Sequence, residues 1–271
     1  MRISKGKLTP DRFLYASDSP DGALPKAGVA WRLDGMAGAR VADTNAAAAK
    51  QYVHTIAAGA RGDAVATGSA VYSDDFVAGS RYVGETHGTR NRGSAALASG
   101  ASLSSSGLGP LVSSASAFTV QAMVKASAHP ASGEALLLAQ ADQANGFAWA
   151  LVERADGKLA FKAKVIDFDG IATDWELVST DVLPLGDWHY VAVSCDKESG
   201  AVKLYIDHQE VAANDSTDGQ ILCGDGGLVS GAVRSFSAVD GLVDEIVFSR
   251  EILSASQLTE IKRYGFIMTV R

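Results

Sequence analysis

The feature that most constrains the fold is an alternation of side chains with period two, which becomes clear from Phe118 onward. Successive side chains of a β-strand point to opposite faces, so an apolar face recurs at every second residue. The first such face is Phe118, Val120, Ala122 and Val124. Two further alternating segments, 147–151 and 159–165, flank Asp156 and Gly157, and Asp-Gly favours a tight reversal. We therefore expect antiparallel strands joined by hairpins.

The segment 188–195 predicts the centre of a sheet, because both of its alternating faces are largely apolar. Shorter strands are expected at 64–72, 94–98, 134–140, 202–206 and 243–248. One short helix is expected after Leu253, because 254–257 fits a capping box and Leu258 and Ile261 continue an apolar stripe. Roughly a dozen short strands with one helix predict an all-β fold, a two-sheet antiparallel sandwich with a short C-terminal helix.

Composition divides the chain into three regions. Residues 1–27 hold three prolines and little periodicity, which predicts an extended N-terminal arm, and 263–271 are expected to form a short tail. Residues 28–262 are expected to form the sandwich. The whole chain has 271 residues, of which 47% are hydrophobic, and this is enough apolar material for one substantial core.

Charge and hydropathy argue against two broad classes of function. The formal net charge of −7 disfavours nucleic-acid binding, which needs a concentrated basic face. No run approaches the roughly 18 apolar residues of a membrane span, and residues 1–11 lack the apolar core of a signal peptide. We therefore expect synthesis in a cytoplasm without the usual export. Cys195 and Cys223 lie in apolar sequence, which favours buried thiols and leaves one disulfide open.

Several segments, in the correct order, resemble the laminin-G-like and pentraxin-like branch of concanavalin A-type jelly rolls. They are 30–34 (AWRLD), 117–125 (AFTVQAMVK), 185–194 (LGDWHYVAVS), 202–208 (VKLYIDH), 241–248 (GLVDEIVF) and 253–258 (LSASQL). Met123 stands where the family usually has tryptophan, and His208 where it has glycine. The resemblance covers about residues 29–262 and implies a jelly-roll sandwich. It implies no single activity, because this fold hosts lectins, hydrolases, lyases and structural modules.

Catalytic motifs of this fold are missing from the sequence. Retaining glycosidases among the relatives use Glu-x-Asp-x-x-Glu, which places carboxylates on one face of a strand, and the chain has no such pattern. Asp244 and Glu245 are adjacent and are expected to point to opposite faces. There is also no Gly-x-Ser-x-Gly elbow. We predict that the protein is not an enzyme, and a glycoside hydrolase or polysaccharide lyase with an unusual site is the less favoured alternative.

One tryptophan is the best candidate for binding a sugar. Carbohydrate sites combine an exposed aromatic face with a few polar groups. Trp175, flanked by Asp174 and Glu176, fits this description at an expected loop-to-strand junction, and a packing role for Trp175 is the alternative. Trp31, Trp149 and Trp188 are expected in the core.

Calcium is the cofactor that the resemblance implies, because many relatives bind it through loop carboxylates and hard oxygen ligands suit this cation. The first candidate ligand set is Asp34, Asp43 and Asp240, and the second is Asp167, Asp169 and Asp174. Neither spacing matches an EF-hand loop, so ordinary solvated turns are the alternative.

These features favour a binding or structural role over catalysis. The first hypothesis is a bacteriophage virion surface component, such as a capsid decoration, head-fibre or tail-associated protein, which contacts neighbouring subunits in an oligomeric assembly. It rests on a fold that usually works outside cells, on the missing export signal, and on an arm and a tail suited to grasping neighbours. The second hypothesis is a carbohydrate-binding lectin module at a cell surface or outside the cell. The two are compatible, because virion surfaces often touch host polysaccharide.

Overall fold

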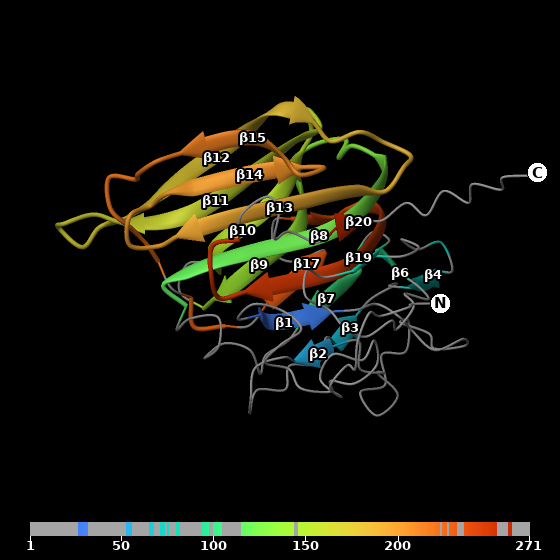
Figure 1. The fold of residues 1–271 in the computed structure, drawn as a ribbon, viewed down its shortest axis with the longest axis horizontal. Helices are drawn as coiled ribbons and strands as arrows, with labels where there is room; N and C mark the ends of the chain where they lie inside the picture. Colours follow the sequence, from blue (N-terminus) through green and yellow to red (C-terminus); the bar gives the residue numbers. More distant parts are fainter. Residues whose placement is uncertain are drawn as a thin grey trace, which may run out of the picture.

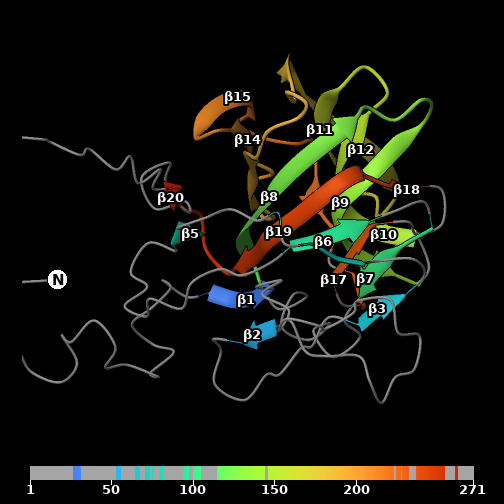
Figure 2. The ribbon, with the colours of Figure 1, turned by 90° about the vertical axis from the view of Figure 1, so that its right-hand side faces the viewer.

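Two large β-sheets pack face to face in the described part of the protein (Figures 1 and 2). The computed structural model describes residues 27–31, 53–55, 65–67, 71–73, 75, 80–81, 94–97, 100–104, 115–143, 146–222, 224–226, 228–231, 236–253 and 260–261. Within these ranges each large sheet contains nine strands, and no helix is present. The expected all-β jelly-roll sandwich is confirmed. No helix in the described part is long and apolar enough to cross a membrane.

The first sheet has the central order β15-β14-β13-β8-β19-β1-β2. These strands are β15 (Gln209–Asn214), β14 (Val202–Ile206), β13 (His189–Asp196), β8 (Ala117–Ala128), β19 (Asp240–Ser249), β1 (Ala27–Trp31) and β2 (Val53–Thr55). In addition, β6 (Ser94–Leu97) pairs with β19 and with β4 (Val71–Ser73). The central position of β13 between β14 and β8 confirms the prediction made for 188–195.

The second sheet has the order β12-β11-β10-β9-β17-β7-β3. These strands are β12 (Ala172–Val182), β11 (Lys158–Ile166), β10 (Gly146–Arg154), β9 (Glu134–Asp142), β17 (Leu228–Gly231), β7 (Ser102–Ser104) and β3 (Val65–Thr67). Two short strands join them: β16 (Gln220–Ile221) pairs with β11, and β18 (Ser237–Ala238) runs parallel to β9. The strands β9 to β12 form a meander of long antiparallel hairpins, which is the part of the sheet that matters for the site.

Aromatic rings fill the space between the sheets. Phe118 on β8 stacks on Trp149 on β10 with ring centroids 4.8 Å apart, and on Phe248 on β19 at 5.6 Å. Phe161 on β11 lies 6.3 Å from Trp149. All four side chains are fully buried, and each contributes on the order of 1.5–3 kcal/mol by leaving water. Trp149 therefore occupies the core, as its alternating sequence predicts.

The β10–β11 hairpin also follows the prediction from Asp156 and Gly157. The Gly157 amide donates to the Arg154 carbonyl at 2.8 Å, and Gly157 has a φ of 77°. A residue with a side chain is strained at that φ, and an added Cβ would lie 2.7 Å from the His129 ring. Glycine therefore allows the turn to close against its neighbour, which fixes the register of the two strands that carry the charged residues described below.

Several expectations need correction or fall outside the described residues. The expected strand at 64–72 is two strands, β3 and β4, which belong to different sheets. The helix expected from Ser254 does not extend to its last turn, because Glu260–Ile261 form strand β20, which pairs with β5 (Ser80–Arg81). The backbone there is extended to bond another strand, a long-range contact that helix-capping signals do not contain. Residues 254–259, the arm up to residue 26, the tail 263–271 and Cys223 lie outside the described residues.

Candidate functional site

The outer face of the second sheet combines an apolar centre with charged margins. Alternation places every second side chain of β9 to β12 away from the core. The buried apolar members of this face are Leu136, Ala139, Ala150, Val152 and Ala160, with Phe147, Val178, Val229 and Phe236 half-buried around them. Beside this cluster, the outward positions of β11 and β12 are charged. Lys162 lies opposite Glu176, and Lys164 lies opposite Asp174.

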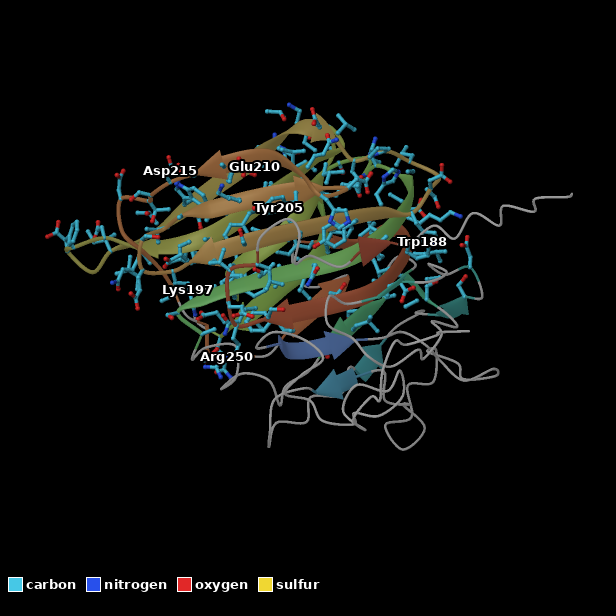
Figure 3. All side chains as sticks on the ribbon, viewed as in Figure 1. Trp188, Lys197, Tyr205, Glu210, Asp215 and Arg250 are labelled. Atoms are coloured by element: carbon cyan, nitrogen blue, oxygen red, sulfur yellow. The ribbon has the colours of Figure 1, made fainter. Side chains whose placement is uncertain are left out.

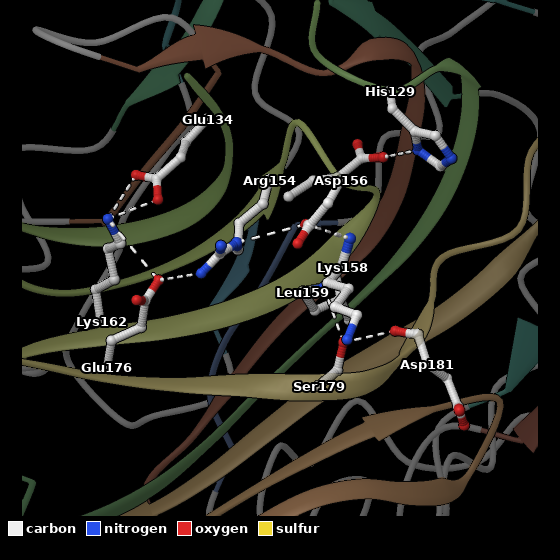
Figure 4. Close-up of polar contacts among 11 residues, drawn as sticks. His129, Glu134, Arg154, Asp156, Lys158, Leu159, Lys162, Glu176, Ser179 and Asp181 are labelled. Atoms are coloured by element: carbon white, nitrogen blue, oxygen red, sulfur yellow. Dashed lines mark hydrogen bonds and ion pairs between the residues drawn. The ribbon is translucent and has the colours of Figure 1, made fainter. Parts of the chain in front are cut away.

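Five side chains from four strands and a turn form an unbroken chain of alternating charges (Figure 4). Lys162 contacts Glu134 across β10, with Nζ 2.6 Å from Oε1, and its Nζ is also 4.0 Å from Oε1 of Glu176. Glu176 Oε1 in turn lies 3.4 Å from Nη1 of Arg154. The Nε of Arg154 lies 3.4 Å from Oδ1 of Asp156 in the hairpin turn. Acceptors and donors thus succeed one another along the surface.

Two further charged residues and two aromatic rings lie at the Lys162 end of this row of charges. Lys164 pairs with Asp174, and its Nζ lies 5.6 Å from the ring centroid of Phe147. The rings of Phe147 and Phe236 are 5.6 Å apart and tilted by 53°. Phe236 precedes β18 and so comes from a distant part of the chain. An apolar contact surface therefore lies directly beside the ion pairs.

These residues line two adjoining hollows. One, of about 510 Å³, is lined by Gly133, Glu134, Arg154, Ala155, Asp156, Lys162 and Glu176. The other, of about 420 Å³, is lined by Glu134, Phe147, Lys162, Lys164, Asp174, Trp175, Glu176 and Phe236. Because Glu134, Lys162 and Glu176 belong to both, the hollows are parts of one depression, which we call the outer groove. Each part has the size of a ligand pocket.

The ion pairs of this row of charges, which we call the charge chain, contribute little to the stability of the fold. The five side chains of the charge chain are between 21% and 48% exposed, and ion pairs as exposed as these contribute about 0–1 kcal/mol each. They do have the arrangement that a polar ligand needs, since carboxylates offer only acceptors whereas lysine and arginine offer only donors. The outer groove is therefore the candidate binding site.

A buried carboxylate hydrogen-bonded to a histidine lies near one end of this groove, on the core side of β10. Glu153 is fully buried and its Oε1 lies 2.7 Å from Nδ1 of His129, while its Oε2 has no hydrogen-bond partner. Burial raises the pKa of Glu153, and the hydrogen bond from His129 acts in the opposite direction. Glu153 adjoins Arg154, so this pair supports the strand end that carries the charge chain.

The three residues predicted to bind a ligand all line the outer groove, but they do not share one face of β12. Asp174 is 79% exposed and pairs with Lys164, and Glu176 belongs to the charge chain. Trp175 lies between them in the strand, is half-buried, and packs against the core between the sheets. Alternation therefore turns its indole away from its two neighbours, which favours the packing role for that ring.

The predicted calcium ligands are not brought together in the described part of the chain. Asp34 and Asp43 lie outside it, and Asp240 is exposed at the start of β19. In the second set, Asp167 Oδ1 accepts hydrogen bonds from the amides of Asp169 and Ile171, each at 2.9 Å, and so closes the β11–β12 turn. Among the described residues no group of three or more His, Cys, Asp or Glu side chains could hold a metal ion.

A larger hollow of about 840 Å³ lies between the turns at one end of the sandwich. Its acidic members are Asp167, Glu198, Asp215 and Asp218, and Phe168 beside them is fully exposed. No lysine or arginine is among the described residues that line it. It lacks the alternation of donors and acceptors that the outer groove has, so we do not take it as the main site.

The outer face of the first sheet differs in kind. Met123, Tyr190, Ala192, Tyr205 and Leu253 form a buried cluster there, and half-buried Trp188 packs against it. Figure 3 labels Tyr205 and Trp188 on this sheet. The Trp188 indole donates to Asp75 at 3.0 Å, so the predicted core role of Trp188 holds only in part.

Asp75 has an ionic partner as well. Its Oδ2 accepts a hydrogen bond from Lys125 at 2.6 Å, and this bond, with the one from Trp188, lowers the pKa of the Asp75 carboxyl.

The sequence predicts a binding role for only three of the groove residues, Asp174, Trp175 and Glu176. Lys162 and Lys164 could have been found, because they alternate with Phe161, Ala163 and Val165 in a strand whose apolar face was recognised. Glu134 and Arg154 require the pairing register of β9 and β10, and Phe236 requires the tertiary fold, so no local signal marks them.

The class defined by these observations is a two-sheet jelly-roll sandwich with a polar groove on one outer face. The family described as the concanavalin A-like lectin/glucanases superfamily (Laminin_G_3) matches residues 91–259, more than half of the chain. The protein belongs to this family, which confirms the resemblance read from the sequence. No curated protein matches the chain in sequence.

Solved structures support the same fold at low identity. Domain 4 of AbnA, a GH43 extracellular arabinanase from Geobacillus stearothermophilus in complex with arabinotriose, is 17% identical with a TM-score of 0.58, covering 86% of this chain and 96% of that one.

The receptor binding domain of botulinum neurotoxin C/D mosaic serotype is 13% identical with a TM-score of 0.56, covering 85% and 49%. The chain thus spans about half the length of the neurotoxin structure. Identities this low establish the fold alone.

Proposed function

We propose that this protein is a non-catalytic module that binds carbohydrate in the outer groove of the second sheet. The observation that carries the proposal is the unbroken chain Glu134, Lys162, Glu176, Arg154 and Asp156 beside an aromatic pair. A sugar hydroxyl is both a donor and an acceptor, so a row of hydroxyls can donate to the carboxylates and accept from the cations in turn. Membership of a family that includes lectins agrees with this role.

The aromatic pair supplies the second element of sugar recognition. The faces of a pyranose or furanose ring carry C–H groups, which pack on apolar aromatic surfaces. Phe147 and Phe236 are half-buried at the Lys164 end of the groove, so part of each side chain remains accessible. The charge chain would orient the ligand, while the two aromatic rings would pack against its sugar rings.

Replacing one ring tests this function. We expect wild-type protein to bind at least one polysaccharide in affinity gel electrophoresis over a panel of plant, bacterial and animal glycans. Phe236→Ala should weaken that binding by about fivefold to tenfold, as the loss of one stacking contact of ~1–1.5 kcal/mol implies. The matched control is Phe168→Ala, which removes a fully exposed ring from the β11–β12 turn, outside the described lining of the groove, and should leave binding unchanged. Binding to no glycan, or equal binding by Phe236→Ala, rejects the proposal.

The absence of catalysis is part of the same proposal. The sequence lacks the paired-carboxylate strand motif of glycosidases, and Asp244 of the adjacent pair Asp244 and Glu245 is fully buried. A buried carboxylate cannot reach a polysaccharide. Incubation with each bound glycan should release neither reducing ends nor unsaturated sugars. Release of either product would establish a glycoside hydrolase or a polysaccharide lyase instead.

A role on a bacteriophage virion remains a prediction from the sequence. In that case the sandwich would decorate a capsid, a head fibre or a tail, contact other subunits in an oligomer, and present the groove to host glycan. Otherwise, we place the module outside the cell or at a cell surface. Detecting the chain in purified virions, together with symmetric oligomers by analytical ultracentrifugation, would support the first setting. A monomer absent from virions would reject it.

Calcium binding by Asp34, Asp43 and Asp240 also remains a proposal. If it occurs, calcium should raise the melting temperature of the wild-type protein, because an ion that binds only the folded state stabilises it. Asp240→Asn should abolish the rise. Identical melting curves of the wild type in calcium and in a chelator would contradict the proposal.

A further inference from the structure

We infer that the ligand of the outer groove is a neutral, extended oligosaccharide rather than one that carries carboxylate or sulfate groups. This inference rests on the proposed function and narrows it to a chemical class. Three observations support it: the ion pairs that the charged residues form, the formal net charge of the groove, and the extended shape of the groove.

Every cation among the described lining residues of the groove already has an anionic partner. Lys162 contacts both Glu134 and Glu176, Arg154 contacts both Glu176 and Asp156, and Lys164 contacts Asp174. A site for an anionic sugar needs a cation whose charge is not already neutralised, as in arginine clusters that bind acidic groups. An anionic ligand would have to displace one of these carboxylates in order to reach a lysine or the guanidinium.

The balance of charge points in the same direction. Among the described residues that line the groove, three cations, Lys162, Lys164 and Arg154, face four carboxylates, which gives these residues a formal net charge of −1. Like charges at close range cost free energy, and they do so more strongly in a partly desolvated groove than in water. A neutral hydroxyl pays no such cost, and it can insert between a carboxylate and a cation because it donates to one and accepts from the other.

The shape favours a chain over a single sugar. The two hollows adjoin through Glu134, Lys162 and Glu176, and they extend from Asp156 in the hairpin turn to Phe236 beside β18. A ligand that fills only one part would leave either the aromatic pair or the Arg154 end without contact. An oligosaccharide of several units can contact both.

Matched glycans that differ in charge test the inference. Wild-type protein is run in affinity gels that contain neutral arabinan, galactan or β-glucan, or acidic polygalacturonate, alginate or hyaluronate. We expect retardation by at least one neutral polymer, and at least about tenfold weaker binding of every acidic one. Raising NaCl from ~50 to ~500 mM should change neutral binding by less than about twofold, because no net charge is neutralised on binding.

A charge-changing variant predicts a change of preference. The double variant Glu134→Gln, Glu176→Gln shifts the formal net charge of the groove from −1 to +1 and leaves Lys162 without its two carboxylates. We expect at least about fivefold weaker neutral binding and a gain in binding of acidic polymers. The control Glu210→Gln removes the partner of Lys203 on the other sheet and should change neither.

The outcomes separate the inference from the proposed function. Tight binding of an acidic polymer by the wild type, lost in Lys162→Met, would overturn the inference and leave a carbohydrate-binding groove in place. Binding of no glycan at all would reject the function and the inference together. Binding of a single neutral monosaccharide as tightly as its oligomers would overturn the extended shape of the ligand.

Discussion

The two outer faces of the sandwich each carry a buried apolar cluster, but they differ in the charged residues beside it. On the first sheet, outward side chains of β8, β13 and β14 form a buried apolar cluster around Tyr190 and Tyr205. On the second sheet, outward side chains of β10, β11 and β12 include Arg154, Lys162 and Glu176, which remain partly exposed in a groove. The charged residues of the second face line a groove, whereas Tyr190 and its neighbours on the first face are buried.

The difference indicates which face is used for binding. Burying Tyr190 and its neighbours stabilises the fold, whereas exposed ion pairs contribute little to it. Substitutions in the buried cluster of the first face should therefore change stability and leave ligand binding intact. Substitutions of the charged groove residues on the second face should do the reverse.

The largest expected effect is that of Tyr190→Ala on the first face. Tyr190 is 1% exposed, donates to Gln121 Oε1 at 2.6 Å, and stacks on His208 at 4.4 Å. Removing the ring should lower the free energy of unfolding by about 3–5 kcal/mol, measured by urea denaturation. A loss below ~1 kcal/mol would mean that this face is not a structural core.

A smaller effect, which depends on pH, is expected from the buried pair behind the groove. Burial raises the pKa of Glu153 above its ordinary value of 4.5, so the native state holds the proton more tightly than the unfolded chain does. The resulting stabilisation is complete below that ordinary value and is lost as the pH rises through the raised pKa. Glutamine does not titrate, so the stability of the wild type relative to Glu153→Gln should fall with rising pH.

Urea denaturation of both proteins between pH ~4 and ~7 measures that difference directly. The control Glu198→Gln replaces an exposed carboxylate and should show no comparable trend. A stability difference that stays constant, or that grows in favour of the wild type with rising pH, would show that burial does not raise the pKa of Glu153.

The smallest effect is expected from His208→Gly on the margin of the first face. Asp207 and His208 have φ values of 48° and 67° in the turn between β14 and β15, where the family resemblance predicts glycine at 208. Glycine relieves about 1 kcal/mol of left-handed strain, and the lost stack on Tyr190 costs about 0.5–1.5 kcal/mol. The two contributions nearly cancel, so the free energy of unfolding, measured by urea denaturation, should change by less than ~1 kcal/mol. A loss above ~2 kcal/mol would contradict this balance.

The fold could be predicted where alternation is strong, and the site could be predicted only in part. The hairpin at Asp156 and Gly157 and the central strand β13 follow from local pattern and turn chemistry. The groove does not, because Glu134, Lys162 and Glu176 meet only through the register of four strands. From the sequence, Trp175 is the best candidate for binding a sugar, because it is an aromatic residue flanked by carboxylates. Alternation turns its ring inward, and the accessible rings are Phe147 and Phe236, of which Phe236 comes from a distant segment.

The most direct test of the outer groove compares two lysines that form ion pairs, one on each sheet. Lys162 pairs with Glu134 on the second sheet and Lys203 pairs with Glu210 on the first, with Nζ–oxygen distances of 2.6 and 2.9 Å. Lys162→Met should weaken binding to the best glycan about tenfold, as loss of a charged hydrogen bond implies, with less than ~1 kcal/mol change in stability. Lys203→Met should leave binding unchanged. Equal effects of the two substitutions on binding would contradict the assignment of the outer groove as the binding site.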